Sequence, residues 1–406
     1  MKSVLLAGLV LLLAACRPVP THPIESVAAD TVAASPDTVA APAPRPVDTV
    51  RSDRFWNDLA RYLAGLPPEA GSTLDSADYA PETAGHRQVF DQLWARKRRD
   101  LLDSLGAWAT AEFPETHRST RPVFYPFSGA DFVTIHTLYP NAESYTLFGL
   151  EPEGRIPHPR TLTPDRRQAN LLNLQYAMDD IMAFSFFKTN DMRGDFTRFE
   201  WKGTLPLLLA FCARCGNEVV NAYRIRILPD GSTAPATDSL AQDPNDATVT
   251  GWRIRFRAAD GSDAPIQTLD YFSVNVHNPF FGQLQGFPAY FEAKAPMHTY
   301  IKSASYLLHK DYFSQVGRLI QQVSPFLLQD DSGFPLRAFD PQTWELTFYG
   351  AYERPIPLFA NLYQLDLHRV YLAGTGVRRL PFGIGYVFIK GRSNLMLARK
   401  RETATE

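Results

Sequence analysis

The fold class is decided by two stretches in which arginine alternates with large apolar residues, YRIRIL at residues 223–228 and WRIRFR at residues 252–257. Alternation with a period of two predicts strands with one buried and one polar face. Asp260-Gly261 is a turn signal ahead of a third strand, predicted at residues 269–276. The polar residues 230–246 predict a long loop between the first two strands. Together these segments predict an antiparallel meander in the middle of the chain.

Helices and further strands are expected on both sides of this meander. Apolar residues at three- and four-residue spacing predict helices at residues 54–66, 86–113, 165–187, 205–220 and 298–323. Short apolar runs predict strands at residues 123–127, 144–150, 344–349, 385–389 and 395–398. This order predicts an α+β fold with N-terminal helices, a central meander sheet and a mixed C-terminal part, and not alternating βαβ units. We expect one large domain at residues 51–406, with a candidate subdivision near residue 295.

The first sixteen residues predict an export signal. A positive start is followed by an apolar run at residues 4–13, which is too short for a bilayer that needs about twenty residues. Leu13-Ala14-Ala15-Cys16 resembles the lipobox of bacterial lipoproteins, and this implies removal of residues 1–15 and acylation of Cys16 by palmitate-type chains. An ordinary secreted protein with a stray cysteine is the alternative. We expect a lipid-anchored cell-envelope protein, in the outer membrane and facing either the periplasm or the cell surface.

Residues 16–50 predict a disordered tether, because Pro, Ala and Thr dominate and no hydrophobic periodicity is present. Asp-Thr-Val occurs three times in it and resembles the acceptor of O-glycosylation in Bacteroidota. The resemblance implies glycans on Thr31, Thr38 and Thr49. Compositional drift in a low-complexity linker explains the repeat equally well.

Composition argues against several classes of function. The chain has 41 basic and 43 acidic residues, a balance that argues against a nucleic-acid partner. Its nine histidines include no HxxxH or HExxH pair, so we expect neither a metal nor another cofactor. Cys212 and Cys215 form a C-x-x-C segment on a predicted helix. A local disulfide or two reduced core thiols suits that position better than a redox pair.

Three segments hold candidate site residues. In YPFSGAD at residues 125–131, Ser128 and Asp131 are spaced either to cap a helix or to hold a reacting group at its N-terminus. On the helix predicted from residue 298, four positions share one face, which is either an acid–base site or a solvated side: His298, Lys302, Ser305 or Tyr306, and His309. Asp330-Asp331 either binds a cation or belongs to a turn.

Four segments carry a resemblance to a known family. They read DLARYLAGLP at residues 58–67, YPFSGAD at 125–131, LFGLEP at 147–152 and LQDDSGFP at 328–335. The chain resembles a family of uncharacterised envelope lipoproteins of Bacteroidota-type bacteria, whose hallmark is Tyr-Pro-Phe-Ser-Gly-Pro-Asp. It departs from the hallmark at Ala130, where the family has proline. The resemblance implies an envelope location and brings no activity with it.

Two functions from different classes are compatible with these observations. The first is a membrane-anchored domain that binds an envelope protein or polysaccharide. The alternative is a hydrolase or transferase that acts on envelope glycan or lipid, so whether the chain is an enzyme stays open. The enzyme requires six side chains to converge in one pocket, namely Tyr125, Ser128, Asp131, His298, Lys302 and Asp330.

Overall fold

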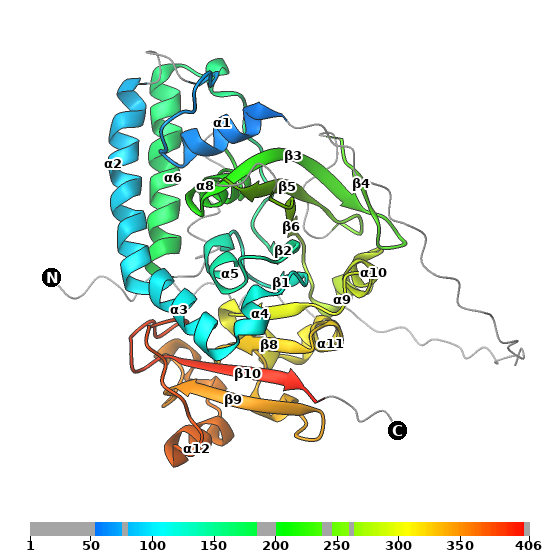
Figure 1. Ribbon diagram of the computed structural model, residues 1–406. Helices are drawn as coiled ribbons and strands as arrows, with labels where there is room; N and C mark the ends of the chain where they lie inside the picture. The colour runs from blue at the N-terminus through cyan, green and yellow to red at the C-terminus, as the bar shows by residue number, and fades with distance from the viewer. Residues whose placement is uncertain (1–52, 75–79, 185–199, 238–245, 260–263, 402–406) are drawn as a thin grey trace, which may run out of the picture. The chain divides into compact units, whose positions relative to one another are not determined.

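A mixed sheet of ten strands runs through the part of the chain that the computed structural model describes, residues 53–74, 80–184, 200–237, 246–259 and 264–401 (Figure 1). The spatial order is β4-β3-β5-β6-β2-β1-β7-β8-β10-β9. The strands are β1 Val123–Tyr125, β2 Ser144–Gly149, β3 Asn217–Ile227, β4 Thr233–Pro235, β5 Thr250–Ala258, β6 Gln267–Ser273, β7 His298–Ile301, β8 Phe326–Gln329, β9 Trp344–Gly350 and β10 Asn394–Lys400.

The structure confirms an α+β fold and the central meander. The meander is β3-β5-β6, in which each neighbouring pair is antiparallel. Its long strands were predictable because large apolar residues alternate with arginine along each of them, although Arg224 on β3 is itself buried and paired with Glu153.

The centre of the sheet is parallel, which the sequence did not indicate. Strands β6, β2, β1, β7 and β8 are neighbours in that order, and all run in the same direction. Two short βαβ units build this part, since α5 (Phe132–Leu138) joins β1 to β2 and α11 (Ser314–Val323) joins β7 to β8. Strands buried on both faces show no alternation, so their pattern cannot be distinguished from that of a buried helix.

Helices cover both faces of the sheet and enclose two hydrophobic cores. On β1, Val123 and Tyr125 face the first core, and Phe124 faces the second. The first core includes side chains of α1 (Arg54–Leu63), α3 (Asp103–Glu112), α5, α6 (Pro164–Phe184) and α8 (Leu205–Arg214). The second includes side chains of α9 (Asn278–Phe281), α10 (Phe287–Glu292) and α11. The β1 strand is therefore buried on both sides.

The other helical segments lie around these layers. Helix α2 (Ala80–Lys97) packs along α6, and the two long helices are neighbours on the left of Figure 1. A π-helical turn at Arg98–Leu102 connects α2 to α3, and α4 (Pro114–Arg118) follows. The 3₁₀ turns are Pro159–Thr161, Ala304–His309, Asp311–Phe313, Leu336–Ala338 and Pro357–Leu362, and the last helix is α12 (Leu365–Ala373).

Three segments depart from their predicted structure. Helix α8 ends at Arg214, and residues 217–220 already belong to β3 because Gly216, with φ of 81°, breaks the helix. Residues 298–301 form β7 where a helix was expected, since β1 and β8 pair with this segment from both sides. Residues 385–387 form a turn, and residues 388–389 have no regular structure, in place of the predicted strand.

Several predictions fall on residues that the structure does not describe. These are the signal peptide, the lipidation site Cys16, the tether, and the glycosylation sites Thr31, Thr38 and Thr49. Residues 50–406 form one compact unit. Within the described ranges, no helix combines the length and the apolar character that a membrane crossing requires.

Candidate functional site at the carboxyl ends of the parallel strands

The polar candidates lie in loops that leave one edge of the sheet. Because β1, β2, β6, β7 and β8 are parallel, their carboxyl ends meet at the same edge, where open parallel sheets hold their ligands. The loops begin at residues 126, 150, 274, 302 and 330, directly after these strands. Tyr125, Ser128, Asp131, Lys302 and Asp330 all lie at this edge or in these loops.

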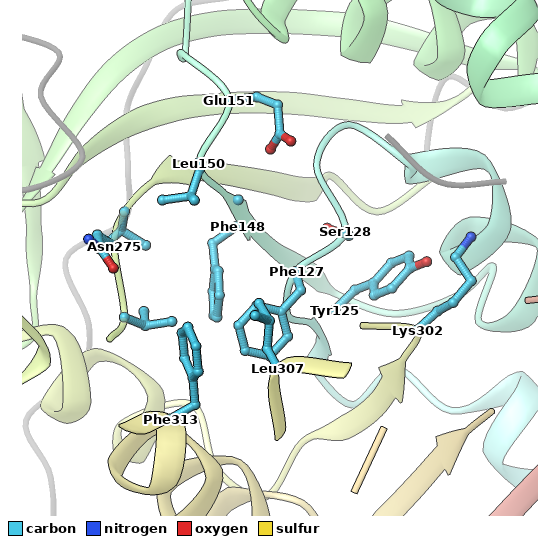
Figure 2. Close-up of a pocket in the computed structure, with 13 residues that line it drawn as sticks. Tyr125, Phe127, Ser128, Phe148, Leu150, Glu151, Asn275, Lys302, Leu307 and Phe313 are labelled. Carbon is cyan, nitrogen blue, oxygen red and sulfur yellow. The ribbon is translucent and has the colours of Figure 1, made fainter. Parts of the chain in front are cut away.

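A cavity of about 130 Å³ opens among the loops (Figure 2). Its apolar lining is Phe127, Phe148, Leu150, Val274, Val276, Leu307 and Phe313. Its polar lining comes from Tyr125, Ser128, Glu151, Asn275 and Lys302. In Figure 2 the Phe127, Phe148 and Phe313 rings lie in the middle of the view, with Glu151 above them and Asn275 to their left. A ligand here would meet aromatic surface and hydrogen-bonding groups together.

The turn from β1 into α5 is conformationally unusual. Phe127, with φ of 60°, adopts the left-handed region although it carries a bulky side chain, a conformation that concentrates at functional sites. Gly129 follows with φ of 55°. Asp131 caps α5 by accepting a hydrogen bond from the Thr134 amide at 3.3 Å. Ser128 instead donates to the Gly129 carbonyl at 3.1 Å and lines the cavity. The predicted capping therefore belongs to the aspartate and leaves the serine at the site.

Asp131 also anchors a buried ionic cluster. The Tyr125 hydroxyl donates to Asp131 Oδ2 at 3.1 Å, and Lys302 Nζ lies 3.7 Å from the same oxygen. The Lys302 side chain is 5% exposed. Burial lowers the pKa of Lys302, and the carboxylates of Asp131 and Asp330 oppose that shift. This lysine is therefore easier to deprotonate than an exposed one.

Asp330 is an acid with a displaced pKa. The Asp330 amide donates a hydrogen bond to the Ile301 carbonyl at 3.3 Å. Asp330 therefore lies beside the start of the loop that contains Lys302. Burial, followed by the neighbouring Asp331, raises the pKa of Asp330 to about 7, against hydrogen bonds from Ser332 and the attraction of Lys302. A carboxyl group with this pKa can both give and take a proton near neutral pH.

The Asp330-Asp331 segment is a turn, as one of its two interpretations predicted. The Gly333 amide donates to the Asp330 carbonyl at 3.1 Å, and the Ser332 amide donates to Asp330 Oδ1 at 3.0 Å. Asp331 faces a different set of partners, accepting hydrogen bonds from the Tyr306 hydroxyl and from Asn394. The two adjacent carboxylates are thus bound separately by protein groups.

His298 lies outside the cluster, and the shared helical face predicted for it does not exist. It begins β7, so it lies at the opposite end of that strand from Lys302. There its ring stacks on Tyr139, with centroids 5.7 Å apart, and burial lowers its pKa to about 3. The strand conformation of residues 298–301 is the reason, because a rise of about 3.3 Å per residue places positions four apart about 13 Å from each other, whereas a helix would hold them about 6 Å apart. Five of the six candidates lie at the site edge, and His298 does not.

Lys97 is a buried charge that the sequence analysis missed. It lies in the basic run at residues 96–99, whose other three members are exposed, yet it is itself only 6% exposed. Burial lowers its pKa to about 8, and it interacts electrostatically with both Asp131 and Lys302. The sequence indicated this burial, because Lys97 lies four residues from both Leu93 and Leu101, which face the core from the same side of the helix.

The cysteines and metal-binding groups add no second centre. Cys212 and Cys215 are both free thiols in the structure, and burial raises the pKa of Cys215 to about 12. Two reduced thiols are one of the two forms that the sequence analysis left open for this C-x-x-C segment. Among the described residues, no three histidine, cysteine or acidic side chains gather in a way that could hold a metal ion.

Comparisons with known proteins give no analogy for this site. The chain matches no protein-family model, no curated protein and no solved structure.

Proposed function

We propose that the chain is a lipid-anchored envelope protein whose domain binds a polysaccharide segment in the cavity at the carboxyl edge of the sheet. One observation carries the proposal: the cavity lies at the carboxyl ends of the parallel strands and is lined by both aromatic and polar side chains. Its volume of about 130 Å³ is close to that of a cavity of about 150 Å³ that holds benzene, so it has room for about one six-membered ring.

A sugar ring suits both walls of the cavity. Its apolar face can pack on the rings of Phe127, Phe148 or Phe313, and its hydroxyls can hydrogen-bond to Glu151 and Asn275. The anchor at Cys16 would keep this domain beside the envelope polymers, as the family resemblance also implies.

Binding can be tested on the full chain purified in detergent, against a panel of bacterial surface glycans and peptidoglycan fragments. We expect Glu151→Gln and Asn275→Ala each to weaken binding about tenfold, because the first replaces a charge-assisted hydrogen bond with a neutral one and the second removes a hydrogen bond to the ligand. Glu345→Gln, an exposed position on β9, is the matched control. Binding that is unchanged in both site variants would refute the cavity as the binding site.

The anchor has a test of its own. Metabolic labelling with a clickable fatty acid should mark the wild-type chain and leave Cys16→Ala unmarked. An unmarked wild-type chain would contradict the anchor without affecting the cavity.

A hydrolase or transferase acting on envelope glycan or lipid is the second candidate, and the buried cluster favours it. Burial lowers the pKa of Lys302 and raises the pKa of Asp330 to about 7, so both could exchange protons near neutral pH, and Asp131 lies 3.7 Å from Lys302 Nζ. Ser128→Ala and Lys302→Met separate the candidates, because a purely binding domain needs neither reacting group. Turnover of an envelope substrate that survives both changes would remove this candidate.

A further inference from the structure

The connection between β9 and β10 is much longer than these two strands require. They are antiparallel neighbours, and Gly350, the last residue of β9, is paired with Asn394, the first residue of β10. A turn of about two to five residues could join strand ends that lie opposite each other. Residues 351–393 join them instead, and an ordered loop of this length in a compact domain typically carries a function.

This long β9–β10 connection packs on the loops of the candidate site. The Ser305 amide donates a hydrogen bond to the Tyr386 hydroxyl at 2.6 Å, and Gln364 Nε2 donates to the Asp331 carbonyl at 3.1 Å. Ser305 and Asp331 belong to the segments that follow β7 and β8. The two halves of the connection also contact each other, because the centroids of the Phe359 and Tyr386 rings lie 5.2 Å apart. One side of the connection is therefore fixed against the site edge.

The other side exposes large apolar side chains. Of the twelve such side chains that are exposed in the described ranges, six belong to this connection, namely Leu358, Tyr363, Leu365, Leu372, Phe388 and Ile389. Single exposed apolar residues are ordinary, but a concentration of them marks an interaction surface. On α12, which Figure 1 shows below β9, Leu367 is the only buried residue and Leu372 is 75% exposed. Leu365 and Leu372, seven positions apart, share the outer face of this helix.

Basic side chains lie among these apolar ones. Four of them are exposed and form no ion pair with any residue that the structure describes, namely Arg369, Arg379, Lys390 and Arg392. Arg369 lies on the outer face of α12, between Leu365 and Leu372. The connection has two acidic residues, and one of them, Glu353, is paired with Arg354 at 2.8 Å. The exposed side of the connection is therefore both apolar and positively charged.

We propose that the long β9–β10 connection docks on the surface of an anionic membrane. Leu365, Leu372 and Phe388 enter the boundary between headgroups and acyl chains, and the cations beside them pair with lipid phosphates. The long stem of Arg369 lets its guanidinium reach the phosphates from an apolar face. Lipid phosphates accept cations at many positions without a fixed geometry, which suits exposed side chains that no neighbour holds in place.

The proposal goes beyond the glycan cavity and requires neither that cavity nor the lipid anchor. Because the connection packs on the segments after β7 and β8, docking would also set the orientation of the candidate site relative to the membrane. A disordered tether alone would leave that orientation free.

Vesicle co-sedimentation tests the docking with a chain of residues 17–406. This chain keeps the whole compact unit of residues 50–406 and lacks both the apolar run of the signal and Cys16. We expect vesicles of phosphatidylglycerol and phosphatidylcholine in equal parts to bind the chain at least about tenfold more tightly than phosphatidylcholine alone, because each cation near an anionic surface contributes a factor of about five. Equal binding to both kinds of vesicle, or to neither, would overturn the proposal.

Matched variants locate the contact. Leu365→Gln combined with Leu372→Gln should weaken binding to the anionic vesicles at least about tenfold, because it removes the apolar contact of α12. Leu172→Gln, at an exposed position on α6, is the control and should leave binding unchanged. Arg369→Gln should weaken binding about fivefold and reduce its dependence on salt, whereas Arg318→Gln, at an exposed position on α11, should not.

The outcomes separate a membrane from other occupants of this surface. The replaced side chains are exposed, so the thermal unfolding temperature of each variant should stay close to that of the wild type, and lost binding then reports on the contact itself. Vesicle binding that survives the double leucine change would refute α12 as the contact. A chain that ignores vesicles but forms a dimer that the same change dissociates would show that a second copy covers this surface. Glycan binding without vesicle binding overturns the docking alone, and the reverse result overturns the glycan cavity alone.

Discussion

Replacing Asp330 with asparagine should remove a pH dependence of stability that the wild-type fold carries. Asp330 is 2% exposed, and burial and the neighbouring Asp331 raise its pKa from 3.8 to about 7 in the folded state. Between these values the folded protein binds more protons than the unfolded chain. The stability from the protonated Asp330 is therefore fully present below pH 4 and is lost as the pH rises through 7.

The size of the effect follows from the displacement of the pKa. Each pH unit between the two pKa values changes the free energy of unfolding by about 1.4 kcal/mol, so the two units from pH 5 to pH 7 amount to about 3 kcal/mol. Asparagine does not titrate and should lack this slope. The groups facing Asp330, which include Lys302, Asp331 and Tyr300, are present in both proteins.

Urea unfolding followed by tryptophan fluorescence at pH 5, 6, 7 and 8 measures the slope in both proteins. Buried histidines such as His86, whose pKa burial lowers to about 4, destabilise both proteins at acid pH and cancel in the comparison. The wild type should lose about 3 kcal/mol relative to Asp330→Asn between pH 5 and pH 8. A difference that stays constant across this range would refute the argument that Asp330 is buried and protonated.

Three further predictions concern stability and thiol chemistry. Arg253→Met should lower the free energy of unfolding by about 3–5 kcal/mol in urea, because the fully buried Asp270 carboxylate loses the two hydrogen bonds of 2.7 and 2.8 Å that Arg253 donates to it. Arg399→Met, at an exposed position on β10, is the comparison. Gly385→Ala should lower the free energy of unfolding by at least about 1–2 kcal/mol, because φ is 71° at this position and the new Cβ would meet the Asp330 carboxylate. Thermal unfolding measures the change, and an unchanged melting temperature would contradict this packing. Ellman's reagent should detect no reactive thiol in the folded domain, because burial raises the pKa of Cys212 and Cys215, and two thiols after unfolding without reductant. If no thiol appears after unfolding, the two cysteines form a disulfide.

The sequence alone located several elements because their signals are local. The alternation in residues 223–228 and 252–257 predicted the meander strands, and the apolar residues of 54–66 predicted α1. Residues 344–349 and 395–398 lie within β9 and β10, as predicted. In each case the neighbours along the chain suffice to distinguish the buried side from the exposed one.

The site was only partly predictable for the same reason. Tyr125, Asp131, Lys302 and Asp330 stood out as residue types with chemical capacity, but their sequence positions span about two hundred residues. His298 and Lys302 were placed on one predicted helix because residues 298–323 show apolar residues at helical spacing. In the structure, residues 298–301 pair with β1 and β8 and therefore form a strand. Lys97 was passed over because its basic neighbours in the chain are exposed.

What the sequence determined by itself was the α+β class, the meander and the inventory of reactive side chains, since periodicity and residue type are properties of short segments. Only the tertiary structure decided that β6, β2, β1, β7 and β8 run parallel. That arrangement brings distant loops to one edge and withdraws Lys302 and Asp330 from water. Hydrogen bonding between strands and loss of hydration depend on neighbours in space, so no window of the sequence contains them.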